Sequence, residues 1–234
     1  MSGAQSPVHR FVSFGPDHLG VLGVTLLGVV ALIVSRERLR HLDDRRLRWV
    51  VAVGLVSNEL LSWPIGLTHG HVRLPLQLCD LALVVTAWAL VSLRPRASEL
   101  AYFWGLAGSL QAVLTPDLRE PFPTYWWLKF FIGHCGVVLS VVYLALTRRV
   151  EATPRSIWRV WGWTNVYAVA AGLINWRFGT NLGYLAHKPL QPSLLDYFGP
   201  WPFYIVALEA TALASFALYY VPFACARPMV GRTA

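Results

Sequence analysis

The sequence predicts an all-α, polytopic membrane protein, a bundle of seven transmembrane helices. The chain has 234 residues, of which 56% are apolar, 13% aromatic and only 14% charged. A soluble domain has about 45–50% apolar and about 25% charged residues. The apolar residues also gather into seven runs, each close to the roughly 20 residues that a helix needs to cross a bilayer. This pattern excludes a water-soluble enzyme and a disordered chain.

The first four helices are defined by the residues around each apolar run. Residues 17–35 end at an arginine cluster that begins at Arg36, whereas a signal peptide carries its charge before the apolar stretch. Residues 48–68 follow that cluster. Residues 74–93 place Pro75 in the first turn, where its missing N–H costs nothing. Residues 98–114 form a short run that ends at the turn signal Thr115-Pro116-Asp117.

Aromatic residues mark the ends of the last three helices. Residues 126–147 begin at Trp126-Trp127, residues 157–177 begin with a group of tryptophans, and residues 200–224 follow Gly199. Trp is enriched at membrane–water interfaces, which suits these positions. No connection is long enough for a separate soluble domain, so we expect one transmembrane domain over residues 1–234.

The basic residues predict the orientation of the chain in the membrane. The formal net charge is +8, but the charges lie between apolar runs, so topology explains them better than a nucleic-acid partner. Fourteen of the 20 basic residues, Arg227 and Arg232 among them, fall on the side of the C-terminus; six, including Arg73, fall on the other. The positive-inside rule therefore puts the N-terminus outside and the C-terminus in the cytoplasm. The expected location is the plasma membrane, as a multi-pass protein of a bacterial inner membrane.

Polar side chains within the predicted helices gather in the half that faces outward. Such residues are costly in a membrane and are functional candidates by default. At a rise of about 1.5 Å per residue, Cys79 lies roughly 8–9 Å and His134 roughly 12 Å from the outer ends of their helices. We therefore expect a cavity that opens to the outer leaflet or to the water outside. The other polar residues assigned to it are Asn58, Glu59, Gln77, Asp80, Gln111 and Glu209.

Cys79 belongs to the richest polar segment, which runs from His71 to Asp80. Arg73, Gln77 and Asp80 are spaced to share one helix face, and Cys79 lies beside them. One interpretation makes Cys79 a nucleophile, because a thiolate is intrinsically reactive. The other makes it a small buried apolar side chain, the usual role of cysteine in a membrane helix.

His134 lies between two glycines, Gly133 and Gly136, that permit close helix approach. It is either a general base or a histidine that hydrogen-bonds across helices. A disulfide between Cys79 and Cys135 is also conceivable on an oxidising side of the membrane. The chain has no HExxH, no glycine-rich phosphate loop and no GxSxG. We therefore expect no metal and no cofactor.

Four segments resemble the family of small integral membrane proteins that includes bacterial YwaF and animal transmembrane protein 164. They come in the family's order and cover about two-thirds of the chain with their connections. The segments are Leu74 to Asp80, Gln111 to Asp117, Phe131 to Gly136, and Ser193 to Tyr204, the last with Asp196 and Trp201.

The resemblance implies a seven-helix fold and, from the animal member, acyl transfer onto lysophospholipids with an active-site cysteine at the position of Cys79. A related-looking group of membrane lipid hydrolases pairs a nucleophile with a histidine, which suggests His134 as the partner. Membrane phospholipids or lysophospholipids are then the expected partners. The sequence indicates no oligomeric state.

Three classes of function follow from these observations. The first is a cysteine-dependent lipid acyltransferase or acyl-ester hydrolase, in which Gln77, Gln111 or a backbone N–H stabilises the oxyanion and Asp80 or Glu209 orients His134. The second is a small-solute transporter that uses Glu59 and Glu209 as proton carriers. The third is a non-catalytic binding protein or scaffold, in which the polar residues only join helices.

Overall fold

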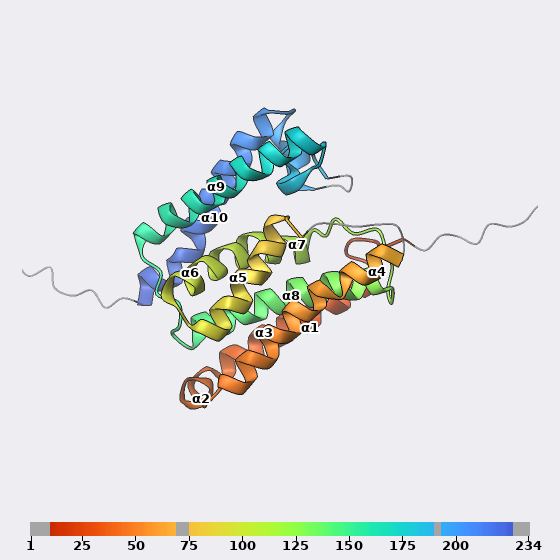
Figure 1. Ribbon diagram of the computed structural model, residues 1–234. Coiled ribbons are helices and arrows are strands. Elements are labelled where there is room, and N and C mark those ends of the chain that lie inside the picture. The colour runs from red at the N-terminus through yellow and green to blue at the C-terminus, as the bar shows by residue number, and fades with distance from the viewer. Residues whose placement is uncertain (1–9, 69–74, 190–192, 227–234) are drawn as a thin grey trace, which may run out of the picture.

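The computed structural model describes residues 10–68, 75–189 and 193–226, and within them all regular structure is helical (Figure 1). The longer helical segments are α1 (Pro16–Val34), α3 (Arg45–Leu60) with α4 (Ser62–Thr68), α5 (Leu78–Ser92), α6 (Pro95–Trp104) with α7 (Leu110–Leu114), α8 (Tyr125–Leu146), α9 (Pro154–Phe178) and α10 (Phe203–Ala226). The connections contain a short helix α2 (Arg36–His41), a π-helical turn η1 (Gly105–Ser109) and two 3-10 turns, η2 (Leu182–Tyr184) and η3 (Leu194–Phe198).

The all-α fold of a membrane protein is confirmed. A helical segment lies in each of the seven predicted ranges, within a few residues at most ends. Four of them are long and apolar enough to cross a bilayer, and α5 is apolar but shorter: the four are α1, α3 with α4, α8 and α10. The count of seven spans stays a prediction. His71, Arg73, Arg227, Arg232 and the start of the predicted span 74–93 lie outside the described residues.

Two helices, α5 and α10, begin later than predicted. α5 begins at Leu78, four residues later than expected, because Gln77 and Asp80 form a capping box that sets the helix start. Pro75 therefore precedes the helix instead of lying in its first turn. α10 begins at Phe203, so Pro200 and Trp201 also lie before the helix.

Helix α8 is the centre of the bundle. Figure 1 shows the hairpin of α9 and α10 on one side of α5 and α6, with α1, α3 and α8 on the other. α8 packs against α1, α3, α5, α6, η1 and α7, and it is apolar on most of its faces, as expected of a buried helix. Glycines permit these approaches. A Cβ at Gly136 would lie 2.8 Å from Leu55 of α3, and a Cβ at Gly105 would lie 2.9 Å from Val141.

Helices α5 and α8 run in the same direction, since Leu83 near the start of α5 meets Gly133 of α8, while their far ends meet at a shared polar cluster. We name the end of the bundle where α5, α8 and α10 begin the Cys79 end. The opposite end, where α3 begins and α8 finishes, is the Asp44 end.

Candidate functional site

Cys79 is the second residue of α5, and its side chain is half-buried. Ala82 and Thr86, three and seven residues further along, are fully buried, so Cys79 lies on the face of α5 that is turned into the bundle. The late start of α5 moves Cys79 and Asp80 into its first turn. The predicted distance of roughly 8–9 Å from Cys79 to the start of its helix is therefore too long, because α5 begins one residue before Cys79.

Gln77 and Asp80 cap α5 and fasten it to a distant loop. The backbone N–H of Gln77 donates to Asp80 Oδ2 at 2.9 Å, which is the capping bond. The side-chain oxygen of Gln77 accepts the backbone N–H of Gly183 at 2.8 Å, and the Tyr167 hydroxyl donates to the Leu76 carbonyl at 3.1 Å. Gln77 precedes the helix, so the predicted helix face that it shares with Asp80 does not form, and Arg73 lies outside the described residues. These contacts give Gln77 and Asp80 a structural role at the site entrance.

His134 is held in one tautomer by its own helix. Its Nδ1 lies 2.7 Å from the Phe130 carbonyl, and the two rings lie 4.2 Å apart between centroids. A carbonyl oxygen only accepts, so Nδ1 carries the proton, and the neutral ring has its lone pair on Nε2. Because this bond stays within α8, it does not join two helices.

The turn of α8 that carries His134 packs on the turn of α5 that follows Cys79. A Cβ at Gly133 would lie 3.7 Å from Leu83, and Leu83 is four residues, about one turn, after Cys79. Side chains of a helix lean toward its N-terminus, and the contact with Phe130 shows that the His134 ring does so. The structure thus brings the Cys79 and His134 turns of α5 and α8 into one region at the Cys79 end.

Asn58 and Glu59, at the end of α3, reach the same turns of α8. The Asn58 side chain donates to the Lys129 carbonyl at 3.0 Å, and Glu59 Oε2 forms an ion pair with Lys129 Nζ at 2.8 Å. Both charged side chains are largely shielded, with 12% of Glu59 and 19% of Lys129 exposed. The sequence analysis assigned Asn58 and Glu59 to the site but treated Lys129 only as a topology charge.

Gln111 and Glu209 make their hydrogen bonds elsewhere. Gln111 is exposed in α7 and donates to Thr115 in the same turn. Glu209 accepts from the Trp161 indole at 2.7 Å and from Asn165 at 3.1 Å, between α9 and α10. The predicted roles of these two side chains, as oxyanion donor and as histidine partner, have no hydrogen bond to support them within the described residues.

The loop residues that the family resemblance singled out hold the loop between α9 and α10 in place. Tyr204 is buried and donates to the Tyr184 carbonyl at 2.6 Å, while the Tyr184 hydroxyl donates to Asp117 at 2.9 Å. Trp201 donates to the Leu185 carbonyl at 3.1 Å. Asp196 accepts from the backbone of Ser193 and caps η3. These residues therefore connect the α9–α10 loop to the loop between α7 and α8.

None of the three cysteines is in a disulfide bond. Cys135 faces α1, where the Thr25 hydroxyl donates to its sulfur at 3.2 Å. The bond that we considered between Cys79 and Cys135 is therefore not present.

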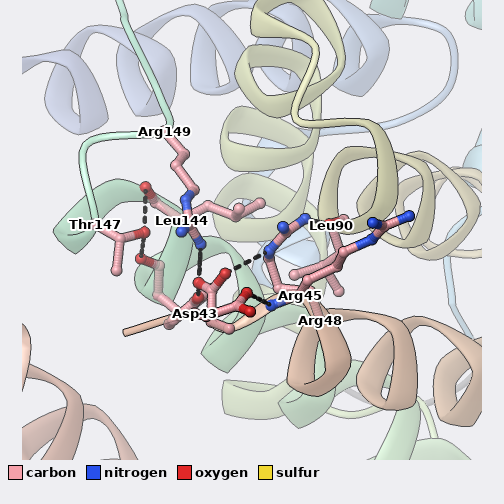
Figure 2. A network of polar contacts seen from close by, with 9 residues as sticks. Asp43, Arg45, Arg48, Leu90, Leu144, Thr147 and Arg149 are labelled. Atoms are coloured by element: carbon pink, nitrogen blue, oxygen red, sulfur yellow. Dashed lines mark hydrogen bonds and ion pairs between the residues drawn. The ribbon is translucent and has the colours of Figure 1, made fainter. Parts of the chain in front are cut away.

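The Asp44 end holds a buried ion cluster that the sequence analysis missed. Asp44 accepts from Arg48 at 2.9 Å and also from Tyr143 and Arg149, and Arg48 donates in turn to the Leu90 carbonyl of α5. Figure 2 shows Arg149, from the segment after α8, reaching toward the start of α3. Burial alone would raise the pKa of Asp44, but the hydrogen bonds from Arg149 and Arg48 outweigh it and hold the pKa below its usual range. The sequence did contain one signal of this cluster: Asp44 lies four residues before Arg48, a spacing that favours an ion pair on one helix face.

A second cluster joins α6 to α9 at the same end. Glu99, 4% exposed, accepts two bonds from Arg159, at 2.7 and 2.6 Å, and one from Ser156 at 2.7 Å. Two-pronged arginine–carboxylate pairs are among the strongest hydrogen-bonded contacts. This cluster holds the α9–α10 hairpin against the rest of the bundle.

The apolar helices and their packing define a helical integral membrane protein. The model of the TMEM164 family matches residues 13–220, so the chain belongs to the TMEM164 family. It is also similar to an uncharacterized protein of Treponema pallidum (strain Nichols), 29% identical over 220 residues, which are 91% of this chain and 90% of that protein. No solved structure matches the chain significantly.

Proposed function

We propose that this chain is a membrane-embedded, cysteine-dependent lipid acyltransferase or acyl-ester hydrolase, with Cys79 as nucleophile and His134 as general base. Membership of the TMEM164 family and the apolar helices support a membrane protein that acts on lipids. The observation that carries the proposal is the position of Cys79 in the first turn of α5, one turn before Leu83, which packs on the α8 turn that holds His134 in a single tautomer.

The local structure suits each residue to its role. A helix N-terminus favours negative charge, and the thiolate is the form of cysteine that attacks carbonyl groups. The proton on Nδ1 of His134 leaves Nε2 as the basic nitrogen. Backbone N–H groups at the start of α5 become the preferred oxyanion donors, since the amides of Gln77 and Gln111 are engaged in other hydrogen bonds.

The proposed reaction has two steps. The Cys79 thiol gives its proton to His134, and the thiolate sulfur attacks the ester carbonyl of a lipid. The carbon–oxygen ester bond breaks, a thioester forms, and the departing alcohol takes the proton from His134. A lysolipid hydroxyl or a water molecule then gives its proton to His134 and attacks the thioester, which releases the new ester or the free acid and restores the thiol.

We further propose seven spans in a bacterial plasma membrane, with the Cys79 end facing outward. The charge distribution supports this orientation. An outward-facing site has no direct access to cytosolic acyl-CoA, so transfer between two lipids or hydrolysis fits it better. A reporter after Ala234 is expected to read as cytoplasmic, and one inserted near Gln191 as external. The opposite result would overturn the outward-facing site.

The decisive experiment is lipid analysis of the purified protein in mixed phospholipids, comparing wild type with Cys79→Ser. The substitution is nearly isosteric, so the protein is expected to fold but to lose most turnover, because a hydroxyl is a far weaker nucleophile. Cys135→Ser and Cys225→Ser are matched controls that keep turnover. An electrophilic lipid-ester analogue should label Cys79. Full turnover by the Cys79→Ser protein would exclude Cys79 as the nucleophile. Absence of turnover by the wild-type protein would instead favour a small-solute transporter or a non-catalytic binding protein.

A further inference from the structure

Lys129 lies at about the same level as Cys79 along the paired helices α5 and α8. Gly133 of α8 packs on Leu83 of α5, and the two helices run in the same direction. Four residues back from each of these positions, about one turn toward the Cys79 end, α8 carries Lys129 and α5 carries Cys79. Packed helix axes are about 8–10 Å apart, so the Lys129 side chain is long enough to approach the Cys79 turn.

The charge of Lys129 is held in place by one partner. Glu59 is its only ion-pair partner among the described residues, at 2.8 Å, and 19% of the lysine side chain is exposed. An ammonium group has three donors and is strongly hydrated in water. Lys129 is largely removed from water and has one anionic partner, so N–H donors of its ammonium group remain for a further acceptor. Binding such an acceptor therefore costs little desolvation free energy.

Tyr125 supplies a second donor on the same side of α8. It lies four residues before Lys129, and Glu59 is close enough to act electrostatically on its phenol. The Tyr125 hydroxyl is buried and has no hydrogen-bond partner within the described residues. Buried polar groups in proteins are nearly always hydrogen-bonded, so the Tyr125 hydroxyl is available to donate to a water molecule or to a ligand.

We propose that Lys129 and Tyr125 bind the phosphate of the lipid whose ester Cys79 attacks, with Glu59 holding Lys129 while the site is empty. This inference rests on the proposed function. A phosphate oxygen accepts from both an ammonium and a hydroxyl, and lysine is a common phosphate ligand. In a glycerophospholipid the glycerol joins the phosphate to the acyl esters, so a phosphate bound at Lys129 directs an ester toward Cys79. Lys129 lies in the second turn of α8, near the expected depth of lipid headgroups.

Glu59 gives the proposal a signature that a purely structural ion pair lacks. A carboxylate beside the phosphate competes for Lys129 and repels the anion, so its removal is expected to strengthen binding. In a structural pair, Glu59→Gln and Lys129→Gln both weaken the same contact and change lipid binding in the same direction. In a phosphate subsite the two substitutions have opposite effects.

The test measures lipid binding by the full chain with Cys79→Ala as background, so that it requires no turnover. Native mass spectrometry would compare 1-oleoyl-lysophosphatidylglycerol with 1-oleoylglycerol, which has the same acyl ester but no phosphate. Lys129→Gln is expected to lower the affinity for the phospholipid about tenfold, the effect of losing one charged contact, and to leave 1-oleoylglycerol unchanged. Glu59→Gln is expected to raise the affinity for the phospholipid, and Tyr125→Phe to lower it less than Lys129→Gln does.

Two control variants separate the subsite from misfolding and from general charge effects. Lys129→Arg should keep the preference for the phospholipid, and Lys188→Gln, at the chain's other lysine, should change nothing. Competition by millimolar inorganic phosphate would identify free phosphate as the ligand source, and its absence would identify the headgroup. The subsite would be overturned if Lys129→Gln, in the Cys79→Ala background, bound both lipids as tightly as the protein that keeps Lys129. That outcome is independent of whether Cys79→Ser abolishes turnover.

Discussion

The two ends of the bundle use polar residues in opposite ways. At the Asp44 end, Asp44 meets three donors and Glu99 meets two, and all but the Arg48–Asp44 bond join elements that lie far apart in the sequence. At the Cys79 end, Lys129 has a single ion partner, and the Tyr125 hydroxyl has none within the described residues. Closed networks hold helices together, whereas groups with unused donors can bind something else. The difference separates the residues that maintain the fold from those that are candidates for function.

His134→Ala is expected to give the largest effect and to act on chemistry alone. Removing a general base costs about 10²–10⁴-fold in rate, while His134 makes its hydrogen bond to its own helix and is only half-buried. Lipid turnover and thermal unfolding in detergent would be measured on the same preparation. A large loss of stability with a proportional loss of turnover would show that His134 is a structural residue. The Cys79 end would then not differ from the Asp44 end in how it uses this residue.

Asp44→Ala should produce the reverse result, a large loss of stability with little change in turnover per folded molecule. It would leave Arg48 and Arg149 without their carboxylate, and breaking a buried pair costs about 3–5 kcal/mol. Chemical unfolding of the purified protein measures this loss. The matched control is Asp43→Ala, because Asp43 is the exposed neighbour at the same helix start. Similar losses from both variants would show that the cluster adds no stability.

Acidification should weaken the Asp44 end through the same carboxylate. Its pKa is lowered in the folded protein, so its contribution to stability is present above the unfolded value of about 3.9 and is lost as the pH falls through the folded pKa. Wild type is therefore expected to lose more free energy of unfolding than Asp44→Asn as the pH falls below about 4. Unfolding curves at a series of pH values would measure the difference. Parallel curves for the two proteins would contradict the assignment.

Glu209→Gln should have the smallest effect. Glutamine keeps an oxygen that can accept from Trp161 and Asn165, and among the described residues Glu209 makes no hydrogen bond at the Cys79 end. We expect turnover within about tenfold of wild type, in contrast to the roughly 10⁴-fold loss when the carboxylate that orients a catalytic histidine is neutralised. A loss near that size would bring Glu209 into the catalytic site.

The sequence predicted helices well and long-range polar contacts poorly. Apolar runs of sufficient length are a local property, so each predicted span contains a helical segment. The start of α5 was misplaced because Pro75 was taken as a helix-start signal, although the capping bond between Gln77 and Asp80 decides the position. Asp44 and Arg149 are 105 residues apart, and each was interpreted only as a charge between apolar runs. No local sequence pattern predicts a contact between two residues so far apart, because the contact depends on how the helices pack.

The candidate site was predictable in part for a related reason. Cys79 and His134 are unusual residues for membrane helices, and the family resemblance singled them out. Lys129 was assigned to topology because a lysine near a helix end is ordinary there. Its contact with Glu59 and its position level with Cys79 depend on how α3, α5 and α8 pack. The sequence was enough to single out Cys79 and His134, whereas the role of Lys129 became visible only from its neighbours in the structure.

The π-helical turn η1 sets how α7 is rotated relative to α6. A π turn holds one residue more than an α-helical turn, and here it lies between Trp104 and Leu110. Deleting the additional residue would rotate α7 by about 100° relative to α6. Val113 would then no longer present its carbonyl to the buried ring of His18, which it now meets at 2.7 Å. Homologues with a one-residue gap at this place should therefore have replaced His18, and those without the gap should have kept it.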